Sequence, residues 1–173
     1  MSFLKNTEMD VSPIQHHAVN LCTEIFWAEG QLESLGNPHL YINQDDLPYF
    51  QLQEPRLKPW TYADLPSSSP STTLVNRANA HLLYFPDDET NEQYKSPQKT
   101  TSIVFYFSLF VVQARAPLLS EATLENFTEF WKGVFIPVQE ASIHFLISAP
   151  RALPAEVSLL YLNRHHIQGY VRP

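Results

Sequence analysis

Two short segments recur at nearly the same spacing, and this internal repeat is the strongest constraint on the fold. Residues 50–57 read FQLQEPRL and residues 136–143 read IPVQEASI, each with apolar positions around a Gln-Glu pair. Further along, residues 74–77 read LVNR and residues 161–164 read YLNR. The repeated Gln and Asn are separated by 23 residues in the first half and by 24 in the second. The spacing favours two copies of one unit over two unrelated β segments that share these letters.

The repeat predicts a mainly β chain built from two similar, small, bent β-sheet or barrel units in tandem, with one short helix in the second unit. The predicted N-terminal arm, first β unit, polar linker and second β unit cover residues 1–18, 19–85, 86–101 and 102–173. Strands are expected near residues 19–35, 50–60, 73–85, 102–116, 134–147 and 157–171.

The predicted helix precedes the second Gln-Glu segment. Ser120 can cap it, and Leu124, Phe127 and Trp131 follow at helical spacing. Gly133 stands just beyond its end, where a left-handed residue often terminates a helix.

In each half, the predicted order of strand, hairpin, irregular link, strand, loop and closing strand resembles the bent β-barrel of the Sm-like superfamily. The segment Leu162-Asn163-Arg164-His165-His166-Ile167 is similar to that family's second motif. Ala28-Glu29-Gly30-Gln31-Leu32, followed by Ile42-Asn43, resembles the first motif. The sequence departs from the family where no glycine follows Arg77 and where Phe110 occupies the position of a turn glycine. Family-type RNA binding needs that glycine turn and a positive rim.

Charge and cysteine content exclude several classes of function. The chain has 11 Lys and Arg against 18 Asp and Glu, a net charge of −7, and no basic cluster. We therefore expect no nucleic-acid partner and no anionic membrane partner. Cys22 is the single cysteine, so it is expected to be a buried apolar residue. The first ten residues contain no apolar core of a signal peptide, which predicts a cytoplasmic location.

No motif for catalysis or cofactor binding is present. The chain lacks G-x-S-x-G, a phosphate loop and a dinucleotide fingerprint, so we expect neither an enzyme nor a cofactor. His165 and His166 are adjacent on a predicted strand and would point to opposite faces, so no metal site is expected. The pairs Asp45-Asp46 and Asp87-Asp88 are interpreted as solvated turn residues.

The repeated motif supplies the candidate site. Either it forms two related ligand pockets, or it is structural, with Asn holding a turn and Arg binding a carboxylate; the structural interpretation is preferred. It predicts an ion pair in each half, Glu54 with Arg77 and Glu140 with Arg164. The candidate residues are Glu54, Asn76, Arg77, Glu140, Asn163 and Arg164.

The apolar run at residues 103–112 (IVFYFSLFVV) bears most directly on function. Read as one strand, it is apolar on both faces, so both faces need a cover. The other half, the predicted helix or a second protein could supply it. The predicted interface residues are Ile103, Phe105, Phe107, Phe110 and Trp131.

These observations favour a non-catalytic adaptor or assembly protein that acts through protein–protein contacts, with a protein partner or a homo-oligomer as its complex. The alternative is a small-molecule-sensing or regulatory β domain, which a concave pocket at the Asn-Arg motif would favour.

Overall fold

The protein is mainly β, as predicted. The computed structural model describes residues 13–60, 70–118, 123, 126–148 and 153–173. Within these ranges it has ten antiparallel strands in one sheet and three short α-helices. The strands are β1 (Ile14–Thr23), β2 (Phe26–Leu35), β3 (Tyr49–Pro59), β4 (Thr72–Asn76), β5 (Ala80–Tyr84), β6 (Thr100–Tyr106), β7 (Phe110–Pro117), β8 (Phe135–Phe145), β9 (Glu156–Asn163) and β10 (Gly169–Val171). The α-helices are α1 (Pro38–Tyr41), α2 (Asp88–Glu92) and α3 (Phe127–Phe130), and the 3-10 turns are η1 (Arg77–Asn79) and η2 (Arg164–His166).

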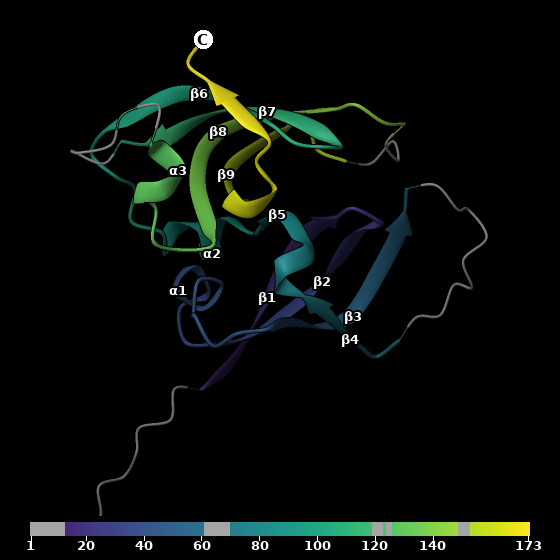
Figure 1. Cartoon of the computed structure of the whole chain (residues 1–173). Helices are drawn as coiled ribbons and strands as arrows, with labels where there is room; N and C mark the ends of the chain where they lie inside the picture. The colour runs from purple at the N-terminus through teal and green to yellow at the C-terminus, as the bar shows by residue number, and fades with distance from the viewer. Residues whose placement is uncertain (1–12, 61–69, 119–122, 124–125, 149–152) are drawn as a thin grey trace, which may run out of the picture.

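The strand order is β10-β6-β7-β8-β9-β5-β1-β2-β3-β4. Residues 14–84 therefore contribute the run β5-β1-β2-β3-β4, and residues 100–171 contribute the run β10-β6-β7-β8-β9. The two runs join where β9 pairs with β5, through Leu82 opposite Leu162 and Leu83 opposite Tyr161. Figure 1 shows β5 at this boundary, between the lower and upper groups of strands. The outer strands, β10 and β4, each have one neighbour in the sheet.

The segment predicted as one strand near residues 19–35 is a hairpin of β1 and β2. Thr23 causes the reversal, because its Oγ1 accepts the backbone N–H groups of Ile25 (3.2 Å) and Phe26 (3.1 Å). The hydroxyl also donates to the carbonyl of Phe26 at 3.1 Å. This local hydrogen bonding by a Thr side chain competes with the strand ladder and turns the chain.

The apolar run at 103–112 is also a hairpin, which makes the prediction of one strand covered on both faces wrong. Ile103 and Phe105 of β6 point into the core with exposed fractions of 1% and 0%, while Tyr106 is 44% exposed. Ser108 lies in the turn before β7. Each strand therefore alternates between a buried and an open face, and only the turn interrupts a run that looks uniformly apolar in the sequence.

Two hydrophobic clusters form the core, and each draws residues from both halves of the chain. The first surrounds β6, β7 and β8 but includes Cys22, Trp27 and Leu82 from the first half. The second surrounds β1, β2 and β3 but includes Phe135 and Tyr161 from the second half. Cys22 is fully buried, as predicted, and burial raises the pKa of its thiol. The shared clusters make the β5–β9 junction part of the core.

The helix predicted before β8 is short, and its predicted end is wrong. Helix α3 has four residues, with Phe127 buried, whereas Ser120 and Leu124 lie outside the described residues. Gly133 does not have a positive φ. A Cβ there would lie 2.7 Å from Oδ1 of Asn43, so close approach to another side chain requires the glycine. That Asn43 side chain binds the backbone of Phe135 through both its oxygen (2.8 Å) and its nitrogen (3.0 Å).

The segment predicted as a polar linker contains a structured turn. Asp87 caps α2 by accepting the backbone N–H of Thr90 at 2.9 Å and its hydroxyl at 2.7 Å. These bonds lower the pKa of the exposed Asp87 carboxyl. Thr90 itself is 3% exposed. The linker therefore carries a buried residue into the junction between the halves.

Candidate functional site

The repeated asparagines hold the turns that follow β4 and β9. Oδ1 of Asn76 accepts the backbone N–H of Ala78 at 2.9 Å, and Oδ1 of Asn163 accepts that of His165 at 3.0 Å. Each asparagine is the N-cap of a three-residue 3-10 turn. This is the structural role predicted for the asparagines, and it places His165 and His166 in η2 rather than on the predicted strand.

The repeated arginines bind backbone carbonyls, so the predicted ion pairs with Glu54 and Glu140 are wrong. The guanidinium of Arg77 donates to the carbonyl of Gln44, and that of Arg164 donates to the carbonyl of Trp131. Among the described residues, the ion pair formed is instead Lys58 with Glu29, at 2.6 Å. Both arginines fasten the closing turn of their half to the chain that precedes its third strand.

Glu54 and Glu140 share an unusual backbone conformation. Their φ angles are 48° and 49°, the only positive values among non-glycine residues of the described chain. Each lies beside a register shift, between Glu29 and Gln31 in β2 and between Gln113 and Arg115 in β7. Both side chains are exposed. Their shared role is therefore a backbone bulge in the third strand of each half.

The structure does not place Phe110 at a turn or at a register shift. Phe110 begins β7 and is fully buried, while Ala114 occupies the register shift of that strand. The corresponding shift in β2 contains Gly30, where a Cβ would lie 3.1 Å from the carbonyl oxygen of Gln53.

Four of the five predicted interface residues belong to the core of the chain. Their exposed fractions do not exceed 3%, so a partner cannot reach them without unfolding; they are Ile103, Phe105, Phe107 and Phe110. Trp131 is half-buried, and its indole N–H donates to the carbonyl of Phe135 at 3.0 Å. The hydrophobicity of the four core residues therefore reflects packing inside the chain.

A buried polar network lies at the β5–β9 junction, where sequence reasoning did not place a site. His39 Nε2 is 2.7 Å from the carbonyl of Thr90, which can only accept, so Nε2 carries the proton. His39 Nδ1 then accepts the hydroxyl proton of Tyr161 at 2.5 Å. Burial lowers the pKa of His39 and raises that of Tyr161, which keeps both groups neutral. In the sequence His39 is one of seven histidines without a motif, so no local signal marks it.

A cavity of about 920 Å³ lies beside this network and is lined from both halves of the chain. Half of its lining residues are aromatic, proline or leucine residues, and the other half are polar or charged. The residues are Asn37, His39, Leu40, Asn43, Gln44, Asp45, Gln93, Tyr94, Lys95, Pro97, Pro117, Trp131, Pro137 and Tyr161.

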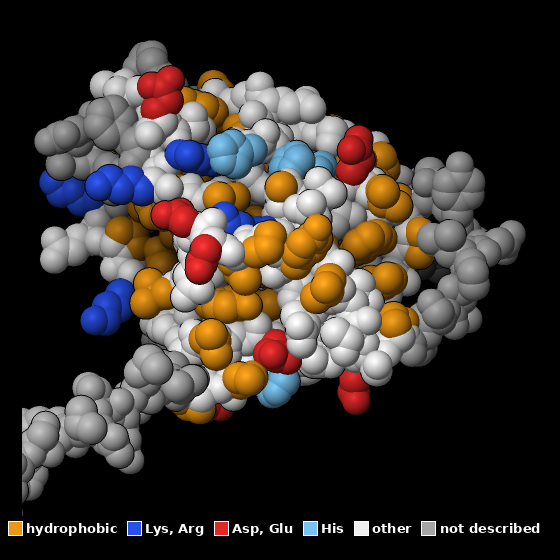
Figure 2. Space-filling view, turned by 60° about the horizontal axis from the view of Figure 1, so that its bottom comes forward, with side chains coloured by type: hydrophobic (Ala, Val, Ile, Leu, Met, Phe, Trp, Pro, Cys, Tyr) orange, Lys and Arg blue, Asp and Glu red, His pale blue; other side chains and the backbone are white. Residues whose placement is uncertain are grey.

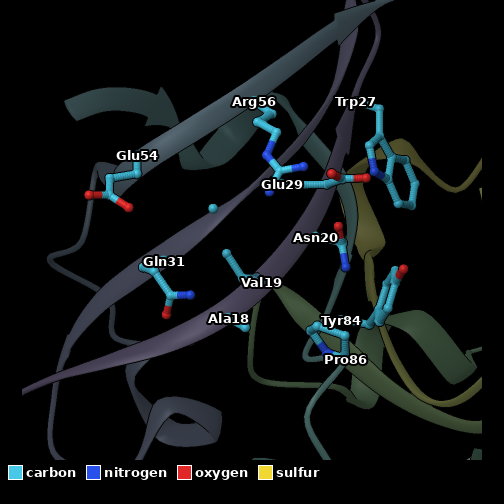
Figure 3. Close-up of a pocket in the computed structure, with 11 residues that line it drawn as sticks. Ala18, Val19, Asn20, Trp27, Glu29, Gln31, Glu54, Arg56, Tyr84 and Pro86 are labelled. Atoms are coloured by element: carbon cyan, nitrogen blue, oxygen red, sulfur yellow. The ribbon is translucent and has the colours of Figure 1, made fainter. Parts of the chain in front are cut away.

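A smaller, polar pocket of about 340 Å³ lies on the first half of the chain. Figure 3 shows Trp27, Glu29, Asn20 and Tyr84 around one side of it, with Glu54 at the opposite side. Its residues come from β1, β2, β3 and β5, with Pro86 from the segment that follows β5.

A third pocket, of about 260 Å³, includes Asn76 but not Arg77. The ring of His81 there is stacked on that of His166, with centroids 4.0 Å apart. Burial, followed by the charge of His166, lowers the pKa of His81 to about 4. Within the described ranges, no three His, Cys, Asp or Glu side chains are placed to hold a metal ion.

Exposed hydrophobic side chains occur at both ends of the sheet. At the β4 end, Leu74 is 60% exposed and Tyr49 of the neighbouring β3 is 47% exposed. At the β10 end, Tyr106 of β6 is 44% exposed and Val171 is 42% exposed. The face at the bottom of Figure 1 carries a broad group of hydrophobic side chains across its middle (Figure 2).

Comparisons of the chain with protein-family models, with curated proteins and with solved structures gave no match. In the part of the chain that the structure describes, none of the helices has the length and apolar character needed to cross a bilayer.

Proposed function

We propose that this protein is a non-catalytic assembly protein whose copies associate head to tail through the two ends of the sheet. The β10 end of one copy would pair with the β4 end of the next. The β5–β9 junction inside the chain is the template for this contact, because it joins the same two kinds of end.

The proposal begins from the equivalence of the two halves, which we interpret as a tandem duplication of a bent five-stranded unit. In space, both halves have their strands in the order fifth, first, second, third and fourth. The pairing registers agree as well. Cys22 faces Trp27 as Tyr106 faces Val111. The resemblance to the Sm-like superfamily is consistent with this arrangement and stays a prediction.

The pairing of the closing strand, β5 in the first half and β10 in the second, also agrees between the halves. Asn20 faces Tyr84 in the β1–β5 pair, and Val104 faces Val171 in the β6–β10 pair. The register therefore makes Val171 the counterpart of Tyr84. Their numbers differ by 87, three more than the 84 between Asn20 and Val104. The same offset relates Asn76 to Asn163, so the closing segments correspond throughout.

The observation that carries the proposal is a difference in exposure between equivalent positions. Cys22 and Tyr84, at the internal junction, have exposed fractions of 0% and 8%, whereas Tyr106 and Val171, at the β10 end, are 44% and 42% exposed. The β10 end thus shows apolar side chains at the positions that the junction buries.

The β4 end shows the same difference. Tyr161 of β9 is 1% exposed at the junction, and its counterpart Leu74 of β4 is 60% exposed. Among the residues that the structure describes, both outer strands have one edge without a strand partner. Such edges are templates for pairing with another chain. Because the two ends differ, the contact is heterologous and produces a closed ring or an open filament.

Light scattering on the purified full chain tests the proposal. We expect a mass of several chains, against 19.9 kDa for one chain. Leu74→Lys places a charge at the β4 end and should give a monomer. The matched control is Leu35→Lys, at an exposed leucine of β2 away from both outer strands, which should leave the mass unchanged. A monomeric wild-type chain at tens of micromolar would contradict the proposal.

The second candidate function, a small-molecule-sensing β domain, is favoured by the 920 Å³ cavity. Its size and its position between the two halves are typical of ligand sites, which measure roughly 300–1,000 Å³ and often lie between domains. Binding of aromatic compounds would change the fluorescence of Trp131, one of its lining residues. A Trp131→Phe variant that shows the same change would exclude this cavity as the site.

A further inference from the structure

We propose that the polar pocket on the first half binds one small, uncharged, hydroxyl-rich molecule of the monosaccharide class. Its volume of about 340 Å³ is at the lower end of the range for small-ligand sites, roughly 300–1,000 Å³. This inference goes beyond the proposed assembly function and uses only the proposed equivalence of the two halves.

The first observation is an unused hydrogen-bond donor in the pocket wall. Nε1 of Trp27 is buried and has no hydrogen-bond partner, and the residue is fully buried. The other two tryptophans are satisfied: Trp60 donates to the carbonyl of Thr23 at 2.9 Å, and Trp131 donates to that of Phe135 at 3.0 Å. An unpaired buried donor destabilises the fold, and a ligand acceptor would supply the missing hydrogen bond.

The second observation is that further polar groups converge beside that donor. Asn20 and Tyr84 are opposite each other in the β1–β5 pair. In Figure 3 the amide of Asn20, the hydroxyl of Tyr84 and the carboxylate of Glu29 all lie on the side of the pocket where the indole nitrogen of Trp27 is found. Burial, followed by the charge of Glu29, raises the pKa of Tyr84 to about 12, so its hydroxyl keeps its proton and can donate.

The charges around the pocket decide the class of ligand. The Glu29 carboxylate pairs with Lys58, and the pocket also contains Glu54 and Arg56. The two carboxylates are balanced by the two basic groups, so no net charge at the pocket selects an anion or a cation. Hydroxyl groups carry no charge and each can donate to a carboxylate while accepting from an indole or amide N–H. A small polyol such as a monosaccharide therefore matches the pocket.

The third observation is that the fold does not require these polar groups. In the proposed alignment of the halves, Asn20, Trp27 and Tyr84 correspond to Val104, Val111 and Val171. The second half builds the same strand pairs with three valines. Valines make strands without a hydrogen-bonding requirement, so the polar groups of the first half are available for a ligand.

The three tryptophans provide the test. In a proton–nitrogen NMR spectrum of the labelled full chain, each indole N–H gives one signal, and Trp27→Phe identifies the signal of Trp27. Titration with a panel of monosaccharides should shift this signal for at least one sugar and saturate. The signals of Trp60 and Trp131 should stay in place, because both donors are already bonded to carbonyls.

Two variants copied from the second half control the assignment. Asn20→Val and Tyr84→Val should each weaken the binding at least tenfold, while unchanged Trp60 and Trp131 signals show that the chain is folded. The proposal is overturned if no sugar shifts the Trp27 signal, or if the shift persists unchanged in both variants. A shift caused by a charged amino acid but by no sugar would overturn the class of ligand. The mass from light scattering is measured separately, so failure here leaves the assembly proposal untouched.

Discussion

Under the proposed alignment of the two halves, the β5–β9 junction buries positions whose counterparts at the outer ends of the sheet are exposed. At the junction, Trp27 is fully buried and contacts Phe145 edge to face, with ring centroids 6.4 Å apart. Its counterpart Val111, next to the β10 end, is only half-buried. The strands that present these residues have the same register, so the difference comes from what covers them. The surface that is buried at the junction is exposed at the outer ends of the sheet. We therefore expect a second chain to bind at these ends.

The largest expected effect compares Trp27 with Val111. Trp27→Ala removes a fully buried indole from the junction core and should lower the free energy of unfolding by about 3–5 kcal/mol. Val111→Ala should lower it by about 1 kcal/mol or less in the monomer, since that side chain is already partly exposed to solvent. Urea unfolding of both variants in the Leu74→Lys background, which keeps the chain monomeric, measures the two values. Equal losses of unfolding free energy in the two variants would show that the two side chains are equally buried.

The next prediction concerns His81, which is buried, whereas its counterpart Gln168 is exposed. Folding lowers the pKa of His81 from 6.5 to about 4, so the unfolded chain binds a proton more readily. The stability from the neutral ring is complete above pH 6.5 and is lost as the pH falls towards 4, by roughly 3 kcal/mol.

His81→Gln, which copies the residue of the second half, should make this pH dependence shallower. Urea unfolding at several pH values between 6.5 and 4 compares the variant with the wild-type chain. If the two slopes agree, His81 does not titrate in this way.

The smallest expected effect tests a feature that the two halves share. Glu54 and Glu140 have φ angles of 48° and 49°, a conformation that glycine adopts without steric cost. Glu54→Gly and Glu140→Gly should each stabilise the chain by about 0.5–1 kcal/mol, and the matched Glu→Ala variants should not. Thermal unfolding detects the change. Opposite signs in the two halves would weaken the proposed equivalence of these positions.

The sequence was sufficient to predict features that depend on local chemistry. An asparagine at the end of a predicted strand, as at Asn76 and Asn163, predicts a turn held by its side chain. The structure has that turn in both halves. The Gln-Glu pair marks a positive φ beside a register shift in both β3 and β8, so its role is a backbone bulge. Both patterns span only a few residues, so they can be recognised in the sequence without knowledge of the tertiary structure.

Features that depend on distant contacts were not predicted. The guanidinium of Arg77 binds a carbonyl 33 residues away in sequence, and a backbone carbonyl leaves no mark in the amino-acid pattern. The contact of His39 with Tyr161 spans 122 residues and exists only because β9 pairs with β5. The run at 103–112 was misread because a short apolar hairpin and a buried strand have the same composition.

The most direct test of head-to-tail assembly mixes two variants that block different ends. Leu74→Lys blocks the β4 end, and Val171→Lys blocks the β10 end; both residues are exposed, so each variant should fold as a monomer. Mixed in equal amounts, the intact β10 end of the first can pair with the intact β4 end of the second, and neither product can grow further. Sedimentation velocity should then show a two-chain particle in the mixture and single chains in each separate sample. A mixture that remains entirely single chains, or a variant that still associates with itself, would contradict the account.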